Sequence, residues 1–332
     1  MYDAATRDSH MTSARGMDRL LPVFAAALVF LFASTSAQAG NIHGSAGERG
    51  FKFLQVNPDA RTAALGDGGV ASSGSAVSII SNPAGLADAS GFSAAAGHAE
   101  WLASIRNEYL GMAMPAWSGG IGVALRMQSS GDIPLRTVVS GGEFEGVPSL
   151  EPFGTYGVHN AAVTAAYSRR MDRLLWGVAV TAIHEKIYLD DVTAFGIDAG
   201  VIWAEGPWRA GAAIRNVGLS GDYRSDGVPL PWDIRVGGSY TRPMGTALLS
   251  ALLDVRYAPD WHETAHAGVE AVLAELLALR IGYRTAFTGR EHNDGLTAGT
   301  GVRLGPVDVD YAYIPTDTGL GSKHLFTLSY SR

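Results

Sequence analysis

Residues 307–313 read VDVDYAY, and the alternation in this stretch recurs along most of the chain. Asp308, Asp310 and Ala312 separate the valines and tyrosines, so apolar and polar side chains lie on opposite faces of an extended segment. A period of two is typical of a β-strand whose faces meet different environments. The stretch therefore predicts a strand that divides an apolar medium from a polar one.

Fourteen segments with this alternation follow one another from Phe92 to the C-terminus. A strand of about 9–11 residues crosses a hydrocarbon core when tilted, and bacterial outer-membrane barrels have an even number of antiparallel strands. We therefore predict an all-β fold, a transmembrane antiparallel β-barrel of about 14 strands. The predicted strands start near residues 92, 107, 118, 160, 174, 193, 207, 231, 247, 262, 276, 295, 305 and 323.

A soluble, exported β-sandwich would show the same alternation with its apolar face turned inward. The polar face favours the membrane barrel, because it is rich in Gly, Ala, Ser, Thr, Arg and Asp, and the whole chain has only Lys52, Lys186 and Lys323 as lysines. Small residues and arginine–carboxylate pairs suit a crowded lumen. Aromatic residues such as Trp101 and Trp203 fall at strand ends, where interfacial girdles occur.

The composition excludes several classes of protein. The 332 residues include 42 Gly and no Cys, so the chain has no disulfide, cysteine-based zinc site or cysteine nucleophile. Its 25 basic and 32 acidic residues give a net charge of −7, which argues against nucleic acid as a partner.

The N-terminus resembles a secretory signal. A run of apolar residues from Leu20 to Ala33 follows Arg15 and Arg19, and Ala37–Ala39 forms an A-x-A cleavage site. The run is shorter than the roughly 20 residues that a spanning helix needs. We therefore predict a cleaved signal peptide over residues 1–39 and location in the bacterial outer membrane, and leave the start codon open between Met1, Met11 and Met17.

Residues 40–91 differ from the strands that follow. They are rich in small and turn-forming residues, which suits a compact segment packed against something else. We predict that they form an N-terminal plug in the lumen and that residues 92–332 form the barrel. Two motifs occur in this segment: Ala60-Arg61-Thr62-Ala63-Ala64-Leu65-Gly66 and Asn82-Pro83-Ala84-Gly85-Leu86-Ala87.

Together these motifs, with Gly268-Val269-Glu270 and the following Leu279-Arg280-Ile281-Gly282-Tyr283, resemble the PorV/PorQ family, which is similar to the FadL-like outer-membrane transporters. The resemblance implies a 14-stranded barrel with a lumenal plug. It also implies either an accessory role in type IX-like protein secretion or passage of hydrophobic compounds. The chain departs from the usual terminal Phe of such barrels, since its last aromatic residue is Tyr330. The plug-motif residues are Arg61, Gly66, Asn82, Pro83, Gly85 and Leu86. We hypothesise that a ligand path lies beside them, near Asn82 to Leu86.

Charged residues of the polar face are predicted to point into the lumen. A buried ion-pair network that holds the plug is one interpretation, and a polar conduit is the other; the near balance of charge favours a filled lumen. The predicted network is Arg126, Asp198, Asp233, Arg235, Asp254, Arg256, Glu270, Arg280, Arg284, Asp308 and Asp310. Asp233 with Arg235, and Asp254 with Arg256, have the i, i+2 spacing of neighbours on one face.

One motif suggests chemistry. His262-Glu263-Thr264-Ala265-His266 matches the H-E-x-x-H zinc site, which requires a helix to bring both histidines to one metal. The same residues alternate as a strand, in which positions i and i+4 lie about 13 Å apart. A secreted zinc hydrolase is therefore the weakest hypothesis, and we expect no enzyme, no catalytic residue, no cofactor and no bound metal.

Two functions remain open at this stage. The first is an accessory or binding role in protein secretion, with secretion machinery or cargo bound by the surface loops at 129–159 and 218–230. The alternative is FadL-like passive transport of a small hydrophobic ligand across the outer membrane. In either case we expect a monomeric barrel surrounded by outer-membrane lipids.

Overall fold

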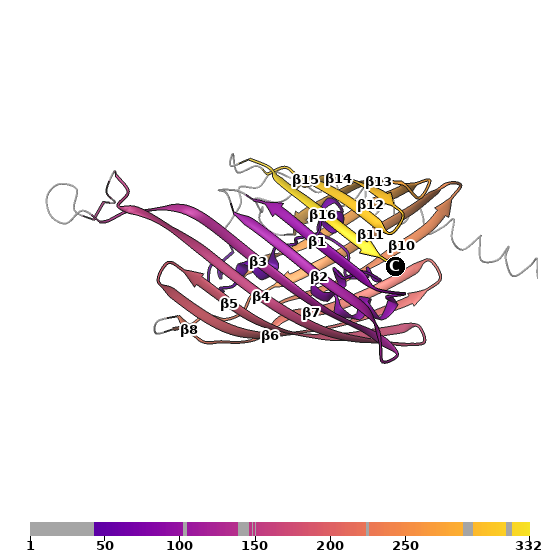
Figure 1. Ribbon diagram of the computed structural model, residues 1–332, viewed down its shortest axis with the longest axis horizontal. Helices are drawn as coiled ribbons and strands as arrows, with labels where there is room; N and C mark the ends of the chain where they lie inside the picture. The colour runs from indigo at the N-terminus through magenta and orange to yellow at the C-terminus, as the bar shows by residue number, and fades with distance from the viewer. Residues whose placement is uncertain are drawn as a thin grey trace, which may run out of the picture. The chain divides into compact units, whose positions relative to one another are not determined.

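The computed structural model describes residues 43–101, 105–138, 146–147, 149, 151–223, 226–287, 295–316 and 321–332. The predicted signal peptide and the alternative start sites lie outside these residues. Within them, 14 antiparallel strands close into a barrel in the order β1-β16-β15-β14-β13-β12-β11-β10-β7-β6-β5-β4-β3-β2 (Figure 1). The strands are β1 (Ser93–Glu100), β2 (Arg106–Ala116), β3 (Gly119–Leu135), β4 (Gly154–Met171), β5 (Leu174–Ile187), β6 (Asp190–Glu205), β7 (Trp208–Ser220), β10 (Asp233–Met244), β11 (Ala247–Ala258), β12 (Trp261–Leu273), β13 (Leu277–Ala286), β14 (Gly295–Leu304), β15 (Val307–Ile314) and β16 (Lys323–Ser331).

The predicted fold class is confirmed, and so is the direction of the faces. Ile281 and Val309 are 55% and 44% exposed on the outer wall, whereas Arg280 and Asp310 are each 6% exposed and face inward. The wall therefore separates an apolar exterior from a polar interior, the reverse of a soluble sandwich. This is the architecture of an outer-membrane barrel.

The long connections are shorter than the sequence predicts. β3 continues to Leu135 and β4 begins at Gly154, with Ile133 paired to Tyr156, so strands occupy much of the predicted 129–159 loop. The predicted 186–192 loop is a turn of two residues, Tyr188 and Leu189, between β5 and β6. The ends of β3 and β4 extend beyond β2 and β5, so the alternation fades there while the backbone pairing continues. In the 218–230 connection, β8 (Asp222–Tyr223) and β9 (Asp226–Gly227) pair with each other.

The two ends of the barrel differ in their connections. One end, here the short-turn end, has tight turns such as Trp117–Ser118, Gly206–Pro207 and Gly305–Pro306. The other, the long-connector end, carries the connections between β3 and β4, β7 and β10, β13 and β14, and β15 and β16.

No helix among the described residues is both long enough and apolar enough to cross a membrane.

Residues 51–90, here the lumenal segment, contain four short helices: η1 (Lys52–Gln55), α3 (Ala60–Ala64), α4 (Ser78–Ser81) and η2 (Pro83–Asp88). The side chain of Asp59 accepts a hydrogen bond from Thr62 N and caps α3, and Asn82 caps η2 ahead of Pro83. α3 contacts strands β13 to β16, and η2 contacts β2 to β6. Because these strands belong to different parts of the closed wall, the segment lies in the lumen (Figure 1).

Candidate functional site

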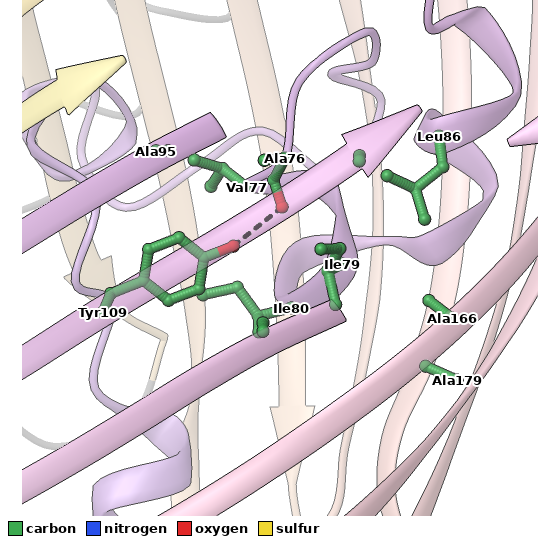
Figure 2. Close-up of a cluster of buried hydrophobic side chains, with 11 residues drawn as sticks. Ala76, Val77, Ile79, Ile80, Leu86, Ala95, Tyr109, Ala166 and Ala179 are labelled. Carbon is green, nitrogen blue, oxygen red and sulfur yellow. Dashed lines mark hydrogen bonds between the residues drawn. The ribbon is translucent and has the colours of Figure 1, made fainter. Parts of the chain in front are cut away.

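The lumenal segment is tightly packed near the short-turn end. Ile79 and Leu86 are fully buried among alanines of the wall, and Tyr109 donates a hydrogen bond of 2.7 Å to Ala76 O (Figure 2). The wall has glycine where η2 approaches it: a Cβ added at Gly177 would lie 2.5 Å from Ala84 N. The absence of side chains at such positions lets backbone contact backbone.

Asn82 fixes η2 through several hydrogen bonds and is fully buried. Its Nδ2 lies 2.8 Å from Val70 O, 3.2 Å from Val201 O and 3.4 Å from Ala212 O, and its Oδ1 accepts from Ala84 N at 3.1 Å. The hypothesised ligand path along Asn82–Leu86 therefore coincides with dense packing, since Asn82, Ala84 and Leu86 are all fully buried.

The remaining plug-motif residues either shape the lumenal segment or contact the wall. Pro83 occupies the first position of η2, and Gly85 lies beside Ser72 and Ser78, where a Cβ would clash. Gly66 has a φ of 74°, which favours glycine, and its N–H donates to Thr297 Oγ1 at 3.0 Å. Arg61 points to the wall carboxylate of Glu270.

A first ion-pair cluster lies near the short-turn end. Glu270 accepts from Arg61 at 2.8 and 2.9 Å and from Arg280 at 2.6 Å, and Arg280 reaches Asp310 at 2.7 Å. Two guanidinium groups therefore balance two carboxylates, and one of the four comes from the lumenal segment. The cluster joins α3 to β12, β13 and β15.

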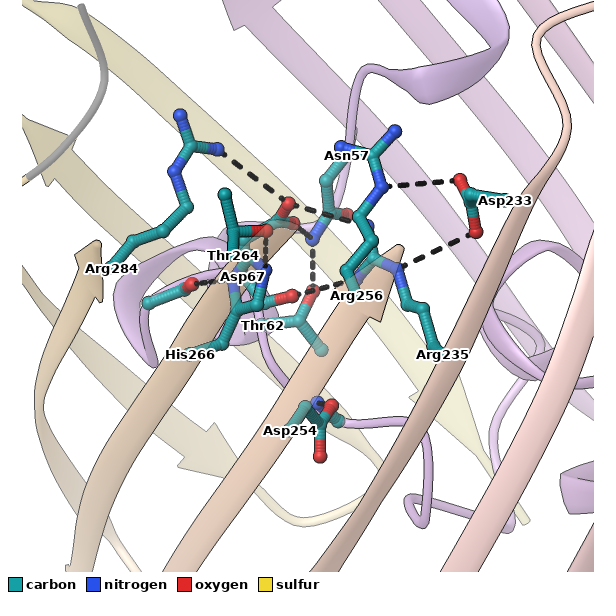
Figure 3. Close-up of polar contacts among 12 residues, drawn as sticks. Asn57, Thr62, Asp67, Asp233, Arg235, Asp254, Arg256, Thr264, His266 and Arg284 are labelled. Atoms are coloured by element: carbon teal, nitrogen blue, oxygen red, sulfur yellow. Dashed lines mark hydrogen bonds and ion pairs between the residues drawn. The ribbon is translucent and has the colours of Figure 1, made fainter. Parts of the chain in front are cut away.

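A second cluster lies nearer the long-connector end (Figure 3). Asp233 is bound by Arg215 at 2.6 and 2.9 Å, and Arg256 and Arg235 lie 3.3 and 3.9 Å from it. Three arginines of the wall therefore surround one carboxylate.

Asp67 of the lumenal segment connects to this second cluster. Its carboxylate lies 3.5 Å from Arg235 and 3.9 Å from Arg284, and it accepts from Asn57 at 2.6 Å. Burial would raise the pKa of Asp67, but Arg235, His266 and Arg284 outweigh burial and lower the pKa to about 2. The sequence pattern does not reveal the role of Asp67, because the residue belongs to an irregular turn (φ 67°) that no periodicity marks.

Several predicted network members bind backbone groups rather than opposite charges. Asp254 does not pair with Arg256; it accepts from Gly69 N and Val70 N at 2.5 and 2.8 Å. Asp198 accepts from Asn216 N at 2.6 Å, and Arg126 donates to Leu54 O at 2.8 Å. These side chains form hydrogen bonds with buried backbone groups that have irregular geometry. Asp308 lies 3.9 Å from Arg303 and is only partly buried.

The H-E-x-x-H motif does not form the helical zinc geometry. His262 and His266 lie in strand β12, where His266 is buried. The ring nitrogens of His266 lie 2.6 Å from Gly66 O and 2.8 Å from Thr264 Oγ1. Among the described residues, no group of three or more His, Asp or Glu side chains could hold a metal ion.

A cavity of about 430 Å³, which the sequence did not predict, lies at the long-connector end, between η1 and the wall. Most of its lining is apolar, including Phe53, Val56, Ile314 and Leu325. Trp101, which the sequence analysis assigned to the outer girdle, lies beyond the end of β1 and lines this cavity instead. The position of Trp101 just after an alternating strand does not indicate from sequence that its side chain lines a cavity.

Two further cavities continue along the lumenal segment. A gap of about 30 Å³ shares Val56, Asn57 and Asp67 with the large cavity. A third cavity of about 310 Å³ near the short-turn end shares Thr62 and Ser81 with this gap and is lined by serines and charged residues. The smallest of the three cavities therefore lies beside Asp67, between the two larger ones.

Comparison with known proteins shows the fold. No protein-family model matches the chain, and no curated protein does. Among solved structures, the P. putida toluene transporter TodX matches with 12% identity over 82% of this chain and 97% of its own, with a TM-score of 0.54. The CymD monoaromatic hydrocarbon channel matches with 12% identity over 85% of this chain and 99% of its own, with a TM-score of 0.55. At 12% identity, both likenesses show the barrel fold alone.

Proposed function

We propose that this chain is an outer-membrane conduit for small hydrophobic molecules, which enter at the long-connector end. The observation that carries the proposal is the cavity of about 430 Å³ with a mainly apolar lining. Ligand pockets commonly have volumes of roughly 300–1,000 Å³. The proposal takes residues 1–39 as the cleaved signal, 40–91 as a plug and 92–332 as the barrel, a division that the sequence predicts.

Likeness of fold adds support to the apolar cavity. The proteins with the matching barrel are named as a toluene transporter and a monoaromatic hydrocarbon channel. We extend a related role to this chain because its own lining is apolar where the lumen opens. We therefore place the ligand path in the cavity beside Phe53 and Val56, and not along Asn82–Leu86 as the sequence suggested.

Passage requires the lumenal segment to move. The gap of about 30 Å³ beside Asn57 and Asp67 is far smaller than the roughly 300 Å³ of an ordinary ligand pocket, so an aromatic ring does not fit there as the segment stands. η1 and the turn around Asp67 must shift relative to the wall. A link between the start of the segment and the wall would therefore stop passage.

The chain offers a clean place for such a link. An ideal Cβ on Gly50 lies 3.7 Å from Val228 Cβ, close to the mean of about 3.8 Å in disulfides. Because the chain has no cysteine, Gly50→Cys with Val228→Cys forms one disulfide and no other. We expect cells that carry the oxidised variant to accumulate labelled toluene no faster than cells without the protein, and reduction to restore uptake. The single variant Gly50→Cys is the matched control, and equal uptake with and without the protein overturns the proposal.

A second candidate role is binding of a secretion partner at the long-connector end. The observation in its favour is the β3–β4 hairpin, which extends beyond β2 and β5 and carries Phe153 at 81% exposure (Figure 1). Phe153→Ser with Val138→Ser removes this apolar surface without touching the barrel. Loss of secreted proteins from the culture medium, with toluene uptake unchanged, would favour this role over the conduit.

A further inference from the structure

A three-residue pattern recurs where strands reach the short-turn end of the barrel. A tyrosine, a serine or threonine, and an arginine follow one another in β4, in β10 and at the end of β16: Tyr167-Ser168-Arg169, Tyr240-Thr241-Arg242 and Tyr330-Ser331-Arg332. The middle hydroxyl group turns inward, since Ser168 is fully buried and Thr241 Oγ1 lies 3.0 Å from Ser250 Oγ. Because successive side chains of a strand alternate between its faces, the tyrosine and the arginine share the outer, lipid-facing side.

Each of these tyrosines packs against an aromatic ring from an adjacent part of the wall. The ring centroids are 5.9 Å apart for Tyr167 and Trp176, 4.5 Å for Tyr240 and Trp208, and 6.3 Å for Tyr330 and Phe92. Aromatic residues at the ends of barrel strands lie at the level of the lipid head groups. Each arginine is two residues nearer the end of its strand and therefore lies in the head-group layer itself.

Arg169 shows how accessible such an arginine is. In the strand register it is paired with Trp176 of β5 on one side and with Gly119 of β3 on the other. Cross-strand partners on one face are close neighbours, but Gly119 has no side chain that would cover the guanidinium group. A lipid head group can therefore approach Arg169 from the side of β3.

The arginines of this rim differ in their partners. Arg170 and Arg173 form ion pairs with Asp88 and Glu205. Arg169 and Arg242 are exposed, and among the described residues no carboxylate forms an ion pair with either of them. Their guanidinium groups are therefore available to an anion that comes from outside the chain.

We propose that these outward tyrosine–arginine sites bind the phosphate groups of anionic glycerophospholipids in the periplasmic leaflet. The short turns of outer-membrane barrels face the periplasm, where the leaflet consists of glycerophospholipids. The planar fork of a guanidinium group matches two phosphate oxygens. Phosphatidylglycerol and cardiolipin carry no amine that would neutralise their phosphate, so we expect the sites to prefer them to zwitterionic lipids. The inference concerns the outer wall and does not depend on what passes through the lumen.

Quenching of tryptophan fluorescence measures this preference in the full barrel, reconstituted at low salt in bilayers of phosphatidylcholine and phosphatidylglycerol. Only the phosphatidylglycerol is brominated, so quenching above that expected from its mole fraction reports its enrichment beside Trp176 and Trp208. We expect an enrichment of about fivefold for the unaltered protein. Arg169→Gln combined with Arg242→Gln should reduce the quenching to the level set by the mole fraction.

The matched control is Arg106→Gln combined with Arg173→Gln, which removes the same number of charges. Arg106 begins β2 at the opposite end of the wall, and Arg173 is already paired with Glu205, so the enrichment should persist. An equal loss in this control would reduce the effect to net charge and overturn the proposal. Absence of enrichment in the unaltered protein, or full enrichment in Arg169→Gln with Arg242→Gln, would overturn it as well.

A second variant tests recognition by the fork and replaces the first if that variant does not migrate as a folded barrel when unheated. Arg169→Lys combined with Arg242→Lys keeps the charge and loses the planar fork, so the enrichment should fall about twofold. Full enrichment in the lysine variant would contradict binding through the guanidinium fork. Stronger displacement of the brominated lipid by lipid A than by unlabelled phosphatidylglycerol would contradict the assignment to the periplasmic leaflet.

Discussion

The short-turn half and the long-connector half of the lumen hold the same segment inside the same wall, yet the segment packs against the wall differently in the two halves. Near the short turns, Gly120, Gly177 and Gly200 let η2 contact the strand backbones directly. At the other end, Trp101, Trp261 and Phe53 hold the segment away from the wall and leave the cavity. The size of the side chains that face the lumen therefore decides how closely the segment packs against the wall. The pattern of strands alone does not determine this.

The ion pairs differ in the same way. In the short-turn half, Glu270 and Asp310 are balanced by Arg61 and Arg280 through bonds of 2.6–2.9 Å. In the long-connector half, Asp233 is shared among three arginines at up to 3.9 Å. The short, matched ion pairs near the short turns suit a fixed anchor, and the longer, shared contacts near the cavity suit a part of the segment that shifts more easily. The predictions below test this division.

The largest effect is expected from breaking the anchor. Arg280→Met leaves Asp310 without its 2.7 Å partner in a buried site, because Arg61 stays with Glu270. Removing one member of a buried pair costs about 3–5 kcal/mol. The midpoint of heat-induced loss of the compact form in gels, and urea unfolding, should both fall. Combining the change with Asp310→Asn should recover part of the loss; no recovery would contradict a pairwise role.

The next effect compares one amide side chain in each half. Asn82→Ala removes the hydrogen bonds that hold η2 to Val70, Val201 and Ala84 in a fully buried place, and should cost about 2–3 kcal/mol. Gln55→Ala removes a bond of 3.1 Å to Pro231 O and a longer one of 3.4 Å from Lys52 Nζ in a partly exposed place, and should cost less than about 1 kcal/mol. Urea unfolding of both variants measures the difference. Equal losses would refute the division into a fixed and an adjustable half.

The sequence predicts the wall far better than its contents. Alternation like that around Ile281 and Val309 places the 14 strands and both of their faces, although not the full length of β3 and β4, because each side chain of a barrel strand meets either lipid or lumen. Inside the lumen that rule ends. Asp254 and Arg256 share a face and spacing, yet Asp254 binds Gly69 N and Val70 N, since an irregular segment presents unpaired backbone groups that no periodicity reveals. The cavity was missed for the same reason: it depends on where η1 docks.

Acid should release the turn between the two halves. The pKa of Asp67 is about 2 in the folded protein, below its value of about 3.9 in an unfolded chain. Its contribution, about 2 kcal/mol, is therefore complete above about pH 4 and is lost as the pH falls to about 2. Asp67→Asn should lose stability at pH 6 and show a flatter dependence between pH 4 and 2 than the unaltered protein. If stability depended on pH in the same way in both proteins, the ion pairs of Asp67 with Arg235 and Arg284 would not be the source of the effect.

The smallest effect should come from adding volume beside the cavity. Val56 lines both the large cavity and the gap, so Val56→Ile places one methylene in empty space and should change stability by less than about 0.5 kcal/mol. The counterpart is Ala84→Val in the packed half, where Ala84 is fully buried against Leu175 and Ile202, and overpacking should cost about 1–3 kcal/mol. Thermal unfolding of the two variants compares them directly. Because Val56→Ile narrows the cavity, it should also weaken ligand binding while leaving stability unchanged. Such a result would show that the long-connector half binds ligand and that the short-turn half anchors the segment. A large stability loss at Val56 would instead mean that both halves are equally packed.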